Sequence, residues 1–317
     1  MTYARHPGDA EVRACFEKHY TGCTPVCIEP ITTGLYNASY FISCSNEEFV
    51  LRVAPLDEAA ATFYERHMMH QEPALHSLLH EKTTVPLPRI LAFDTDHDIV
   101  DRDFLLMERL PGAPLSDAVG VNNGCVFRQI GKHLAQVHAL TAPTFGYRGD
   151  HKPMTPQNTW TDAFCIMWRR LVEDVSRSGM YNAREAKMVS ELVEEHSSLF
   201  SHCRTASLLH MDIWSQNILV DSASKVTGII DWDRALWGDP EIEFAVLDYC
   251  GISEPPFWEG YGQPRPEGPQ ARLRNAFYLL YELQKYIPIN ILRKHNPSAA
   301  HACKYQVMDL IRRTFTP

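Results

Sequence analysis

The residues best suited to chemistry lie between positions 208 and 233, in the segment LLHMDIWSQNILVDSASKVTGIIDWD. Two apolar runs, ILV and KVTGII, flank the turn-like DSAS, and this pattern predicts an antiparallel hairpin. In such a hairpin Asn217, which enters the first strand, lies beside Asp231, which leaves the second. An amide oxygen and a carboxylate meeting there suit Mg²⁺, which takes one or two protein ligands and completes its shell with water and phosphate.

A second carboxylate, Asp212, stands on the loop that leads into this hairpin and could accept the proton of an attacking hydroxyl. The order His210-x-Asp212-x-x-x-x-Asn217, followed by Asp231, is the layout of kinase catalytic loops: base, metal-binding amide, metal-binding carboxylate. His210 belongs to this catalytic set and is expected to orient the loop, since Asp212 already supplies a base. Asp233 could bind a second ion or only form a local hydrogen bond. The alternative is a polar loop with a capping Asp and a turn Asn.

The first hundred or so residues predict strands around one long helical segment. That segment, residues 57–81, contains Pro73, which must kink or divide the helix because proline removes a backbone donor. The predicted strands are 27–31, 38–43 and the runs EEFVLRVAP, PRILAFD and RDFLLMERL. The helical stripe predicted to be core is Met68, Met69, Leu75, Leu78 and Leu79. The last strand runs into Pro111 and Gly112, a natural break.

Beyond that break the sequence predicts mainly helices, because apolar residues recur at three- and four-residue spacing. The helical stretches are IGKHLAQVHAL and residues 160–177, 182–200, 271–286 and 298–315. Residues 255–269 hold five prolines and three glycines and predict a loop, either a substrate lid or only a connection. The expected architecture is a small sheet-plus-helix domain followed by a larger helical domain that contains the hairpin.

The segments LLHMDIWSQNILVD and GIIDWDRALWGDPEIEFA resemble the two hallmark motifs of the aminoglycoside phosphotransferase and choline-kinase-like family. Glu243 stands where that family usually has Asp. The resemblance implies an α+β, protein-kinase-like fold with two lobes. The small β-rich N-lobe would be residues 1–110, with a hinge at about 107–112. The larger, mainly helical C-lobe, residues 111–317, would hold the catalytic loop, the metal motif and the acceptor site.

The resemblance extends to the nucleotide side of the chain. TTGLYNASYFI is similar to the family's shortened nucleotide loop, with Gly34 and Asn37 at its usual positions. FVLRVAP would present Arg52, in place of Lys, to the phosphates, and Glu72 would pair with that cation. Glu108 and Leu110 would offer backbone groups to the adenine or guanine edge. Whether the proline after Glu72 displaces this residue from its pairing geometry stays open at this point.

The function that this resemblance implies is transfer of the γ-phosphate of ATP or GTP, with Mg²⁺, to a hydroxyl of a small molecule. An aminoglycoside-like or other hydroxylated antibiotic ranks first. A metabolic kinase for an amino alcohol, sugar or homoserine-like acceptor is the alternative. Outside the enzyme class, the chain could be a nucleotide-binding pseudokinase that acts as an interaction module.

Acidic residues of the last third could bind a cationic acceptor or form a solvated face; they are Glu241, Glu243, Asp248, Glu254, Glu259, Glu267 and Glu282. Aromatic residues Trp214, Trp237, Trp258 and Tyr261 could wall a sugar.

Composition restricts the other possibilities. The 317 residues carry a net charge of −9, which argues against a nonspecific nucleic-acid partner. No apolar run reaches the roughly 18 residues that span a bilayer, and the first residues have no apolar core of a signal peptide, so we expect a cytoplasmic protein without a membrane partner. The nine cysteines are scattered and predict reduced structural thiols rather than a disulfide framework. His19, Cys23 and Cys27 form the only local cluster, and a fourth ligand for zinc is not evident nearby.

Overall fold

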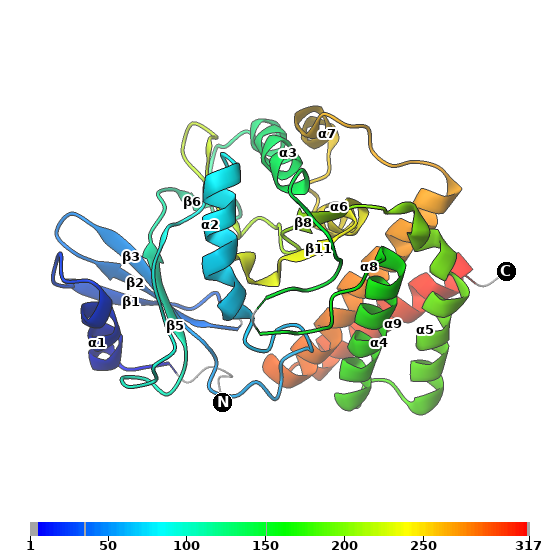
Figure 1. Ribbon diagram of the computed structural model, residues 1–317, viewed down its shortest axis with the longest axis horizontal. Coiled ribbons are helices and arrows are strands. Elements are labelled where there is room, and N and C mark those ends of the chain that lie inside the picture. The colour runs from blue at the N-terminus through cyan, green and yellow to red at the C-terminus, as the bar shows by residue number, and fades with distance from the viewer. Residues whose placement is uncertain (1–5, 35, 150, 316–317) are drawn as a thin grey trace.

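The N-terminal part of the chain is built on a five-stranded antiparallel sheet (Figure 1). The computed structural model describes residues 6–34, 36–149 and 151–315. Its strands are β1 (Cys27–Ile31), β2 (Ala38–Ser43), β3 (Glu48–Val53), β4 (Ile90–Asp94) and β5 (Phe104–Glu108), in the order β1-β2-β3-β5-β4. All five were expected from the sequence, because their β-branched and aromatic runs are bounded by turn residues.

The two faces of this sheet have different partners. Leu51 and Leu106 face the same cluster as Val12 and Phe16 of α1 (Asp9–His19), a helix that the sequence analysis did not predict. Alternation along β3 turns Arg52 to the opposite face, where its strand neighbour Leu105 packs with Met69. The face that carries Arg52 therefore lies toward the segment that contains Glu72, which sets up the pair described below.

The helical segment expected over residues 57–81 is helical only from Met68 onward. A short 3-10 helix, η1 (Met68–Gln71), precedes α2 (Glu72–Lys82), and residues before η1 form turns. Pro73 explains the division, because in the first turn of α2 its missing N–H costs no intrahelical hydrogen bond. Glu72 nevertheless has helical dihedrals, with φ of −59° and ψ of −44°. The predicted stripe is buried except for Leu78, which is only partly buried.

The C-terminal part is mainly helical, as predicted. Its helices are α3 (Asn123–His138), α4 (Trp160–Arg177), α5 (Ala183–Glu195), α6 (Pro240–Tyr249), α7 (Pro255–Tyr261), α8 (Pro269–Pro288) and α9 (Pro297–Phe315), with a 3-10 turn η2 (Ser197–His202) and a π-helical turn η4 (Ile289–Arg293). A large aromatic core that includes Trp160, Trp168 and Phe277 joins α4, α5, α8 and α9, which gather at one end of the molecule (Figure 1). Among the described residues, no helix combines the length and apolar character needed to cross a membrane.

The predicted hairpin is present. Strands β9 (Ile218–Val220) and β10 (Val226–Ile229) pair antiparallel, with Ile218 opposite Ile229. A third strand, β6 (Ala113–Pro114), pairs with β9 and extends the hairpin to a three-stranded sheet. In the chain, β6 follows shortly after the last strand of the N-terminal sheet. A second small sheet consists of β7 (Thr141–Ala142), β8 (Ala206–Leu209) and β11 (Leu236–Gly238). In the chain, β8 comes directly before the loop that leads into the hairpin, and β11 comes directly after the loop that leaves it. These short strands hold residues 210–217 and 230–235 in place.

The expectation of a loop over residues 255–269 is wrong for its first half. Pro255 and Pro256 begin α7, because proline is tolerated in the first helical turn. This helix packs tightly on α3, near α6 (Figure 1). A Cβ atom at Gly260 would lie 1.9 Å from the Arg128 carbonyl oxygen, and one at Gly131 would lie 2.1 Å from the Phe257 carbonyl oxygen. Glycine on both helices therefore permits the close approach.

The expectation that all nine cysteines are reduced is also wrong. Cys23 and Cys44 form a disulfide with a Cα–Cα distance of 6.1 Å. The pairing of Cys27 with Ser43 brings the segment before β1 beside the end of β2, and this register places the two cysteines within bonding reach. Cys27 stays free and exposed, and His19 bonds Asp94 at 2.6 Å, so the cluster of His19, Cys23 and Cys27 does not assemble as a metal site.

The contact between α3 and α7 gives a stability prediction. Replacing Gly260 with Ala should lower the free energy of unfolding by about 1–3 kcal/mol, because the new methyl group must push the two helices apart. The control is Glu259→Ala, which removes only an exposed ion pair to Arg128 and should cost at most about 1 kcal/mol. Urea unfolding of the three proteins measures the difference. Equal stability of the two variants would contradict the packing argument.

Candidate active site

The centre of the candidate site is the buried guanidinium of Arg52, which three carboxylates share. Its NH1 donates to Glu72 Oε2 at 2.8 Å. Its NH2 donates to Asp231 Oδ1 and to Asp233 Oδ2, both at 2.9 Å. Strand β3, helix α2 and the 3-10 turn η3 (Trp232–Arg234) thus meet at one cation. Pro73 does not displace Glu72 from this pairing.

Three carboxylates around one guanidinium leave an excess of negative charge. Burial raises the pKa of Glu72 to about 7; Arg52 opposes this shift and the Asp231 carboxylate adds to it. Burial, together with the charge of Asp231, also raises the pKa of Asp233 well above its usual value. Glu72 Oε1 is buried and has no hydrogen-bond partner. A divalent cation would relieve this charge, so the donor set fits Mg²⁺.

Asp231 has the position and backbone that a metal ligand here requires. It precedes η3 in a left-handed conformation with φ of 70°, a strained geometry for a non-glycine residue that is common at functional sites. Its side chain is 38% exposed, whereas that of Asp233 is 3% exposed, so Asp231 is the carboxylate that a solvent-borne ion can reach. The Ile230 N–H donates to the Asn217 carbonyl at 3.0 Å, which brings Asn217 next to Asp231 as the hairpin register predicts.

His210 is fully buried and both its ring nitrogens contact backbone groups. Nδ1 accepts from the Asp212 N–H at 3.1 Å, so Nε2 carries the proton and donates to the Ile230 carbonyl at 3.0 Å. Burial lowers the pKa of His210, which keeps the ring neutral. These contacts tie the catalytic loop to the second hairpin strand. His210 is therefore in a position to orient Asp212.

The Asp212 carboxylate lies between an amide and two cations. The Asn217 Nδ2 donates to Asp212 Oδ2 at 3.1 Å and to its carbonyl at 2.9 Å, which leaves the amide oxygen of Asn217 available as a ligand. Arg234 donates to Asp212 Oδ1 at 3.0 Å, and Lys285 Nζ lies 3.8 Å from the same atom. Burial opposes ionisation of Asp212, but the charges of Arg234 and Lys285 outweigh it and hold the pKa of this carboxyl below its usual value. Asp212 is thus an anion ready to accept a hydrogen bond.

A buried network of ion pairs continues from Asp212 and was not predicted from the sequence. Arg234 bonds Glu65 Oε1 at 3.2 Å, and Arg293 of η4 bonds the other oxygen of Glu65. The attraction of the two arginines outweighs burial and lowers the pKa of Glu65 to about 2. This network joins the turn before η1 to the C-terminal helices. The only available signal was Arg234 directly after the Asp-Trp-Asp run, while Glu65 was assigned to a predicted helix.

The Glu243 carboxylate binds the backbone of the loop that leads to Asp212. One of its oxygens accepts from the Met211 N–H at 2.6 Å and the other from the His210 N–H at 3.2 Å. His138 of α3 lies 2.8 Å from the same carboxylate. Burial opposes ionisation, but His138 and the backbone donors lower the pKa of Glu243. Glu243 is therefore committed to the loop and is not part of an acidic surface.

Of the other predicted nucleotide residues, Asn37 reaches this centre. Asn37 Nδ2 approaches Asp233 Oδ2 at 3.4 Å, and its buried Oδ1 has no hydrogen-bond partner. Gly34 precedes Asn37 by three residues, and Leu35 between them lies outside the described residues. The Glu108 N–H donates to the Arg89 carbonyl at 3.0 Å, and Leu110 packs beside Gly228 of the hairpin. Contact of Glu108 and Leu110 with a nucleotide base stays a prediction.

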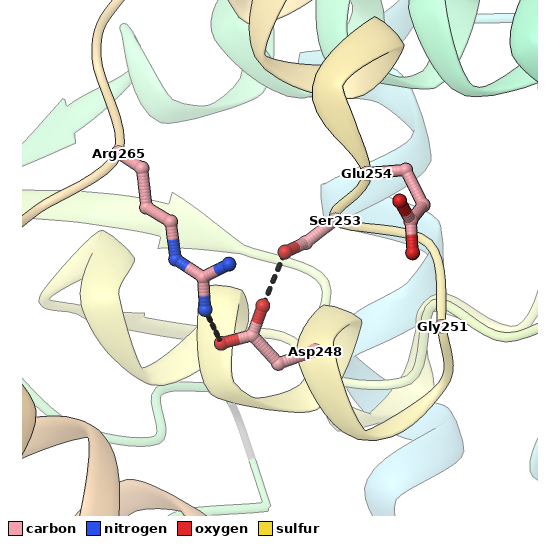
Figure 2. Close-up of a pocket in the computed structure, with 5 residues that line it drawn as sticks. All are labelled: Asp248, Gly251, Ser253, Glu254 and Arg265. Carbon is pink, nitrogen blue, oxygen red and sulfur yellow. Dashed lines mark hydrogen bonds and ion pairs between the residues drawn. The ribbon is translucent and has the colours of Figure 1, made fainter.

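Most of the acidic residues proposed for a cationic acceptor are already paired. Five of the seven contact cations or histidines: Glu241 with Arg274, Glu243 with His138, Asp248 with Arg265, Glu259 with Arg128 and Glu282 with Lys285. Figure 2 shows one of these pairs in a shallow pocket of about 290 Å³, where Asp248 is held by Arg265 at 2.5 Å and by Ser253. Glu254 on the rim of the pocket and Glu267 are exposed. Five of these seven carboxylates are therefore already engaged by partners within the protein.

The predicted aromatic wall is likewise dispersed. Trp258 and Tyr261 lie on α7 and pack against Phe244, and the Tyr261 hydroxyl lies 2.8 Å from His138 Nδ1. They belong to the packing between α3, α6 and α7, because α7 is a helix and not an open loop. Trp214, two residues after Asp212, is 41% exposed. Tyr249 is 51% exposed and its ring lies 6.1 Å from that of Tyr286, which bonds Glu282 at 3.0 Å.

Comparison with known proteins identifies the class of this site. A family model described as the phosphotransferase enzyme family matches residues 28–301. The chain is 28% identical over 255 residues to a probable ketoamine kinase of Klebsiella aerogenes, an alignment that covers 77% of each chain. It is 22% identical over 229 residues to hygromycin-B 4-O-kinase of Escherichia coli, which covers 68% of this chain and 60% of that protein.

A solved structure shows the same fold. A thermostable mutant of the aminoglycoside phosphotransferase APH(4)-Ia, in ternary complex with AMP-PNP and hygromycin B, superposes with a TM-score of 0.66 at 18% identity. The match covers 97% of this chain and 99% of that one. The protein-kinase-like fold expected from the sequence is thereby confirmed. Since the family model spans most of the sequence, the chain belongs to the phosphotransferase enzyme family and is a small-molecule kinase.

Proposed function

We propose that this kinase transfers the γ-phosphate of ATP to a hydroxyl of a sugar-derived ketoamine. The observation that carries the phosphotransferase part is the Arg52 guanidinium held among Glu72, Asp231 and Asp233, with the Asp212–Asn217 pair beside it on the hairpin. The relative of known fold in complex with AMP-PNP supports ATP as the phosphate donor.

On the phosphate side, Glu72 would hold Arg52 through NH1, and phosphate oxygens would share the guanidinium donors with Asp231 and Asp233, which now accept from NH2. Asn217 and Asp231 would hold Mg²⁺, with Asp233 next to them. When bound, the ion supplies charge that offsets the negative charge developing on the transferred group. Glu72 and Asp233 keep the guanidinium in place before the nucleotide arrives, so little reorganisation is needed.

On the acceptor side, Asp212 would accept a hydrogen bond from the attacking hydroxyl and orient its oxygen toward the phosphorus. Its lowered pKa makes it a weak base, which suits a loose transition state in which the proton moves late. His210 and Glu243 fix the backbone that carries Asp212. Arg234 and Lys285 hold Oδ1, so Oδ2, which accepts from the Asn217 amide, is the oxygen that would turn to the acceptor.

Two observations favour a ketoamine over an antibiotic acceptor. The sequence-based expectation ranks an antibiotic first, whereas the curated relative with the higher identity is a probable ketoamine kinase and the antibiotic kinase is more distant. Five of the seven acidic residues considered for a cationic acceptor are neutralised within the protein. A sugar-derived acceptor with few charges fits this better than a polycation.

The division into lobes at residue 110 belongs to the same proposal. Gly112 has φ of 110°, and a Cβ there would lie 2.4 Å from Thr227 Oγ1, so glycine is needed where the N-terminal sheet leads to β6. We place the hinge at about residues 107–112. The complete set of Arg52, Glu72, Asp212, Asn217 and Asp231 argues against the pseudokinase alternative.

Replacing Asp212 with Asn should lower kcat roughly 10²- to 10⁴-fold, because the acceptor hydroxyl loses its anionic partner. Binding of ATP should change little, since Arg52 and Asp231 remain. Steady-state kinetics and calorimetry with a non-hydrolysable ATP analogue separate the two effects. Asp101→Asn, on a side chain that is 78% exposed, is the matched control. A variant with the wild-type rate would refute the assignment of Asp212.

Replacing Asp231 with Asn should reduce turnover by roughly 10²- to 10³-fold or more and raise the Mg²⁺ concentration needed for half-maximal activity. The reason is that one carboxylate of the charge excess around Arg52 is lost. A Mg²⁺ titration of the initial rate at saturating ATP measures both quantities. An unchanged Mg²⁺ dependence would place the ion elsewhere.

An acceptor panel tests the substrate class. We expect kcat/KM for an N-substituted 1-amino-1-deoxyfructose to exceed that for hygromycin B or viomycin by roughly tenfold or more, a modest discrimination for a pocket built on shape and hydrogen bonds. Coupled release of ADP is the measurement. Turnover with the antibiotics alone would reverse the proposed acceptor while leaving the kinase assignment intact.

A further inference from the structure

A cluster of histidines and carboxylates lies in the N-terminal part of the chain, outside the kinase machinery. His67, His70 and Asp103 each offer one ligand atom, and these atoms all lie within 4.8 Å of one another. His70 Nε2 lies 2.7 Å from one oxygen of Asp103, and His97 Nε2 lies 2.7 Å from the other. The Oε2 atom of Glu58 also lies 3.5 Å from the Nε2 atom of His67.

The backbone brings these side chains together from separate segments. His67 directly precedes η1 and His70 lies within it, where residues three apart lie one above the other, and the His70 N–H donates to the His67 carbonyl at 3.1 Å. Asp103 directly precedes β5, and its carbonyl accepts from the Ala54 N–H at 2.9 Å. His97 comes from the loop between β4 and β5. A bound ion would therefore connect η1 to the segment that leads into β5.

The chemistry of this donor set differs from that of the phosphate site. Imidazole nitrogens with one carboxylate suit Zn²⁺, whereas Mg²⁺ prefers oxygen ligands throughout. In the structure the ring nitrogens contact the Asp103 oxygens directly at 2.7 Å. Tetrahedral zinc ligands sit roughly 3.3 Å apart, so these pairs need to open by only about 0.6 Å to admit the ion.

We propose that His67, His70 and Asp103 form a zinc-binding site, with His97 and Glu58 as flanking ligands. Three protein ligands leave one position for water or for a flanking residue, as in other zinc sites with an open position. The Asp103 side chain is 10% exposed and that of His67 is 64% exposed, so the cluster has both a fixed carboxylate and access from solvent. This inference does not rest on the acceptor or on the kinase reaction.

The site adjoins the phosphate machinery through η1. Gln71, the residue after His70, donates from its side chain to the Asp233 carbonyl. Glu72 follows and contacts Arg52. An ion that holds His67 and His70 would thus fix the start of α2 relative to Asp233, without contacting a phosphate-binding residue.

The direct test is zinc binding by the full-length protein, with accessible cysteines alkylated and Mg²⁺ in excess so that thiolates and the Asn217–Asp231 site do not compete. Equilibrium dialysis with Zn²⁺ should give one tight site per chain. His67→Ala should weaken its affinity roughly tenfold or more, and this exposed residue can be removed without loss of the fold. His70→Ala and Asp103→Asn should have larger effects. His301→Ala, on the exposed surface of α9, is the matched control.

Two further measurements decide the outcome. Substitution of Co²⁺ for Zn²⁺ should give the visible bands of a four-coordinate ion, and these bands should vanish in His67→Ala and persist in Asp231→Asn. Zinc affinity that is the same in wild type, His67→Ala and Asp103→Asn would overturn the proposal, as would the absence of a site that withstands excess Mg²⁺. Loss of binding in Asp231→Asn alone would assign the ion to the kinase centre and also overturn it.

Discussion

The buried guanidinium of Arg52 is the constraint on which the rest of this structure depends. A cation with an 8% exposed fraction is stable only if carboxylates accept its donors, and three of them come from different parts of the chain. Glu72 fixes the start of α2, while Asp231 and Asp233 fix the turn after the hairpin. The N-terminal sheet, α2 and the turn after the hairpin are thereby positioned by one side chain, around which three carboxylates gather.

A second charge network holds the acceptor half in a similar way. Asp212 is bound by Arg234, Arg234 by Glu65, and Glu65 by Arg293. The buried ions are paired throughout, so removal of one partner would leave an uncompensated charge, which costs about 3–5 kcal/mol. These ion pairs join the turn before η1, the turn η3 and the π-helical turn η4. Backbone strain at Met211 and Asp231, with φ of 67° and 70°, persists inside this framework.

Local sequence patterns predicted much of the fold and the catalytic hairpin. Strands β1, β2 and β5 and helix α4 have short-range signals, such as alternation or apolar spacing, and their predicted positions agree with the structure. Features that depend on residues distant in the sequence were not predicted. Residues 57–67 are not helical, and there Glu65 instead bonds Arg293 of η4, a partner distant in the sequence. The α7 segment has a high proline content, which predicts a loop, but Pro255 and Pro256 occupy the first helical turn. The disulfide of Cys23 with Cys44 followed from strand register, which spacing alone did not reveal.

The same distinction explains why the acceptor was harder to infer than the reaction. Phosphate binding uses few residue types at fixed spacing, because the charge of the nucleotide and its ion demands them. Acceptor recognition depends on which carboxylates remain free after folding, and no count of acidic residues reveals that. Glu243 illustrates the point: on the sequence it is one more acid near the metal motif, but in the structure it is buried and accepts two N–H groups of the catalytic loop. Five of the seven acidic residues first considered for a cationic acceptor likewise have partners within the protein, and only the folded structure reveals this.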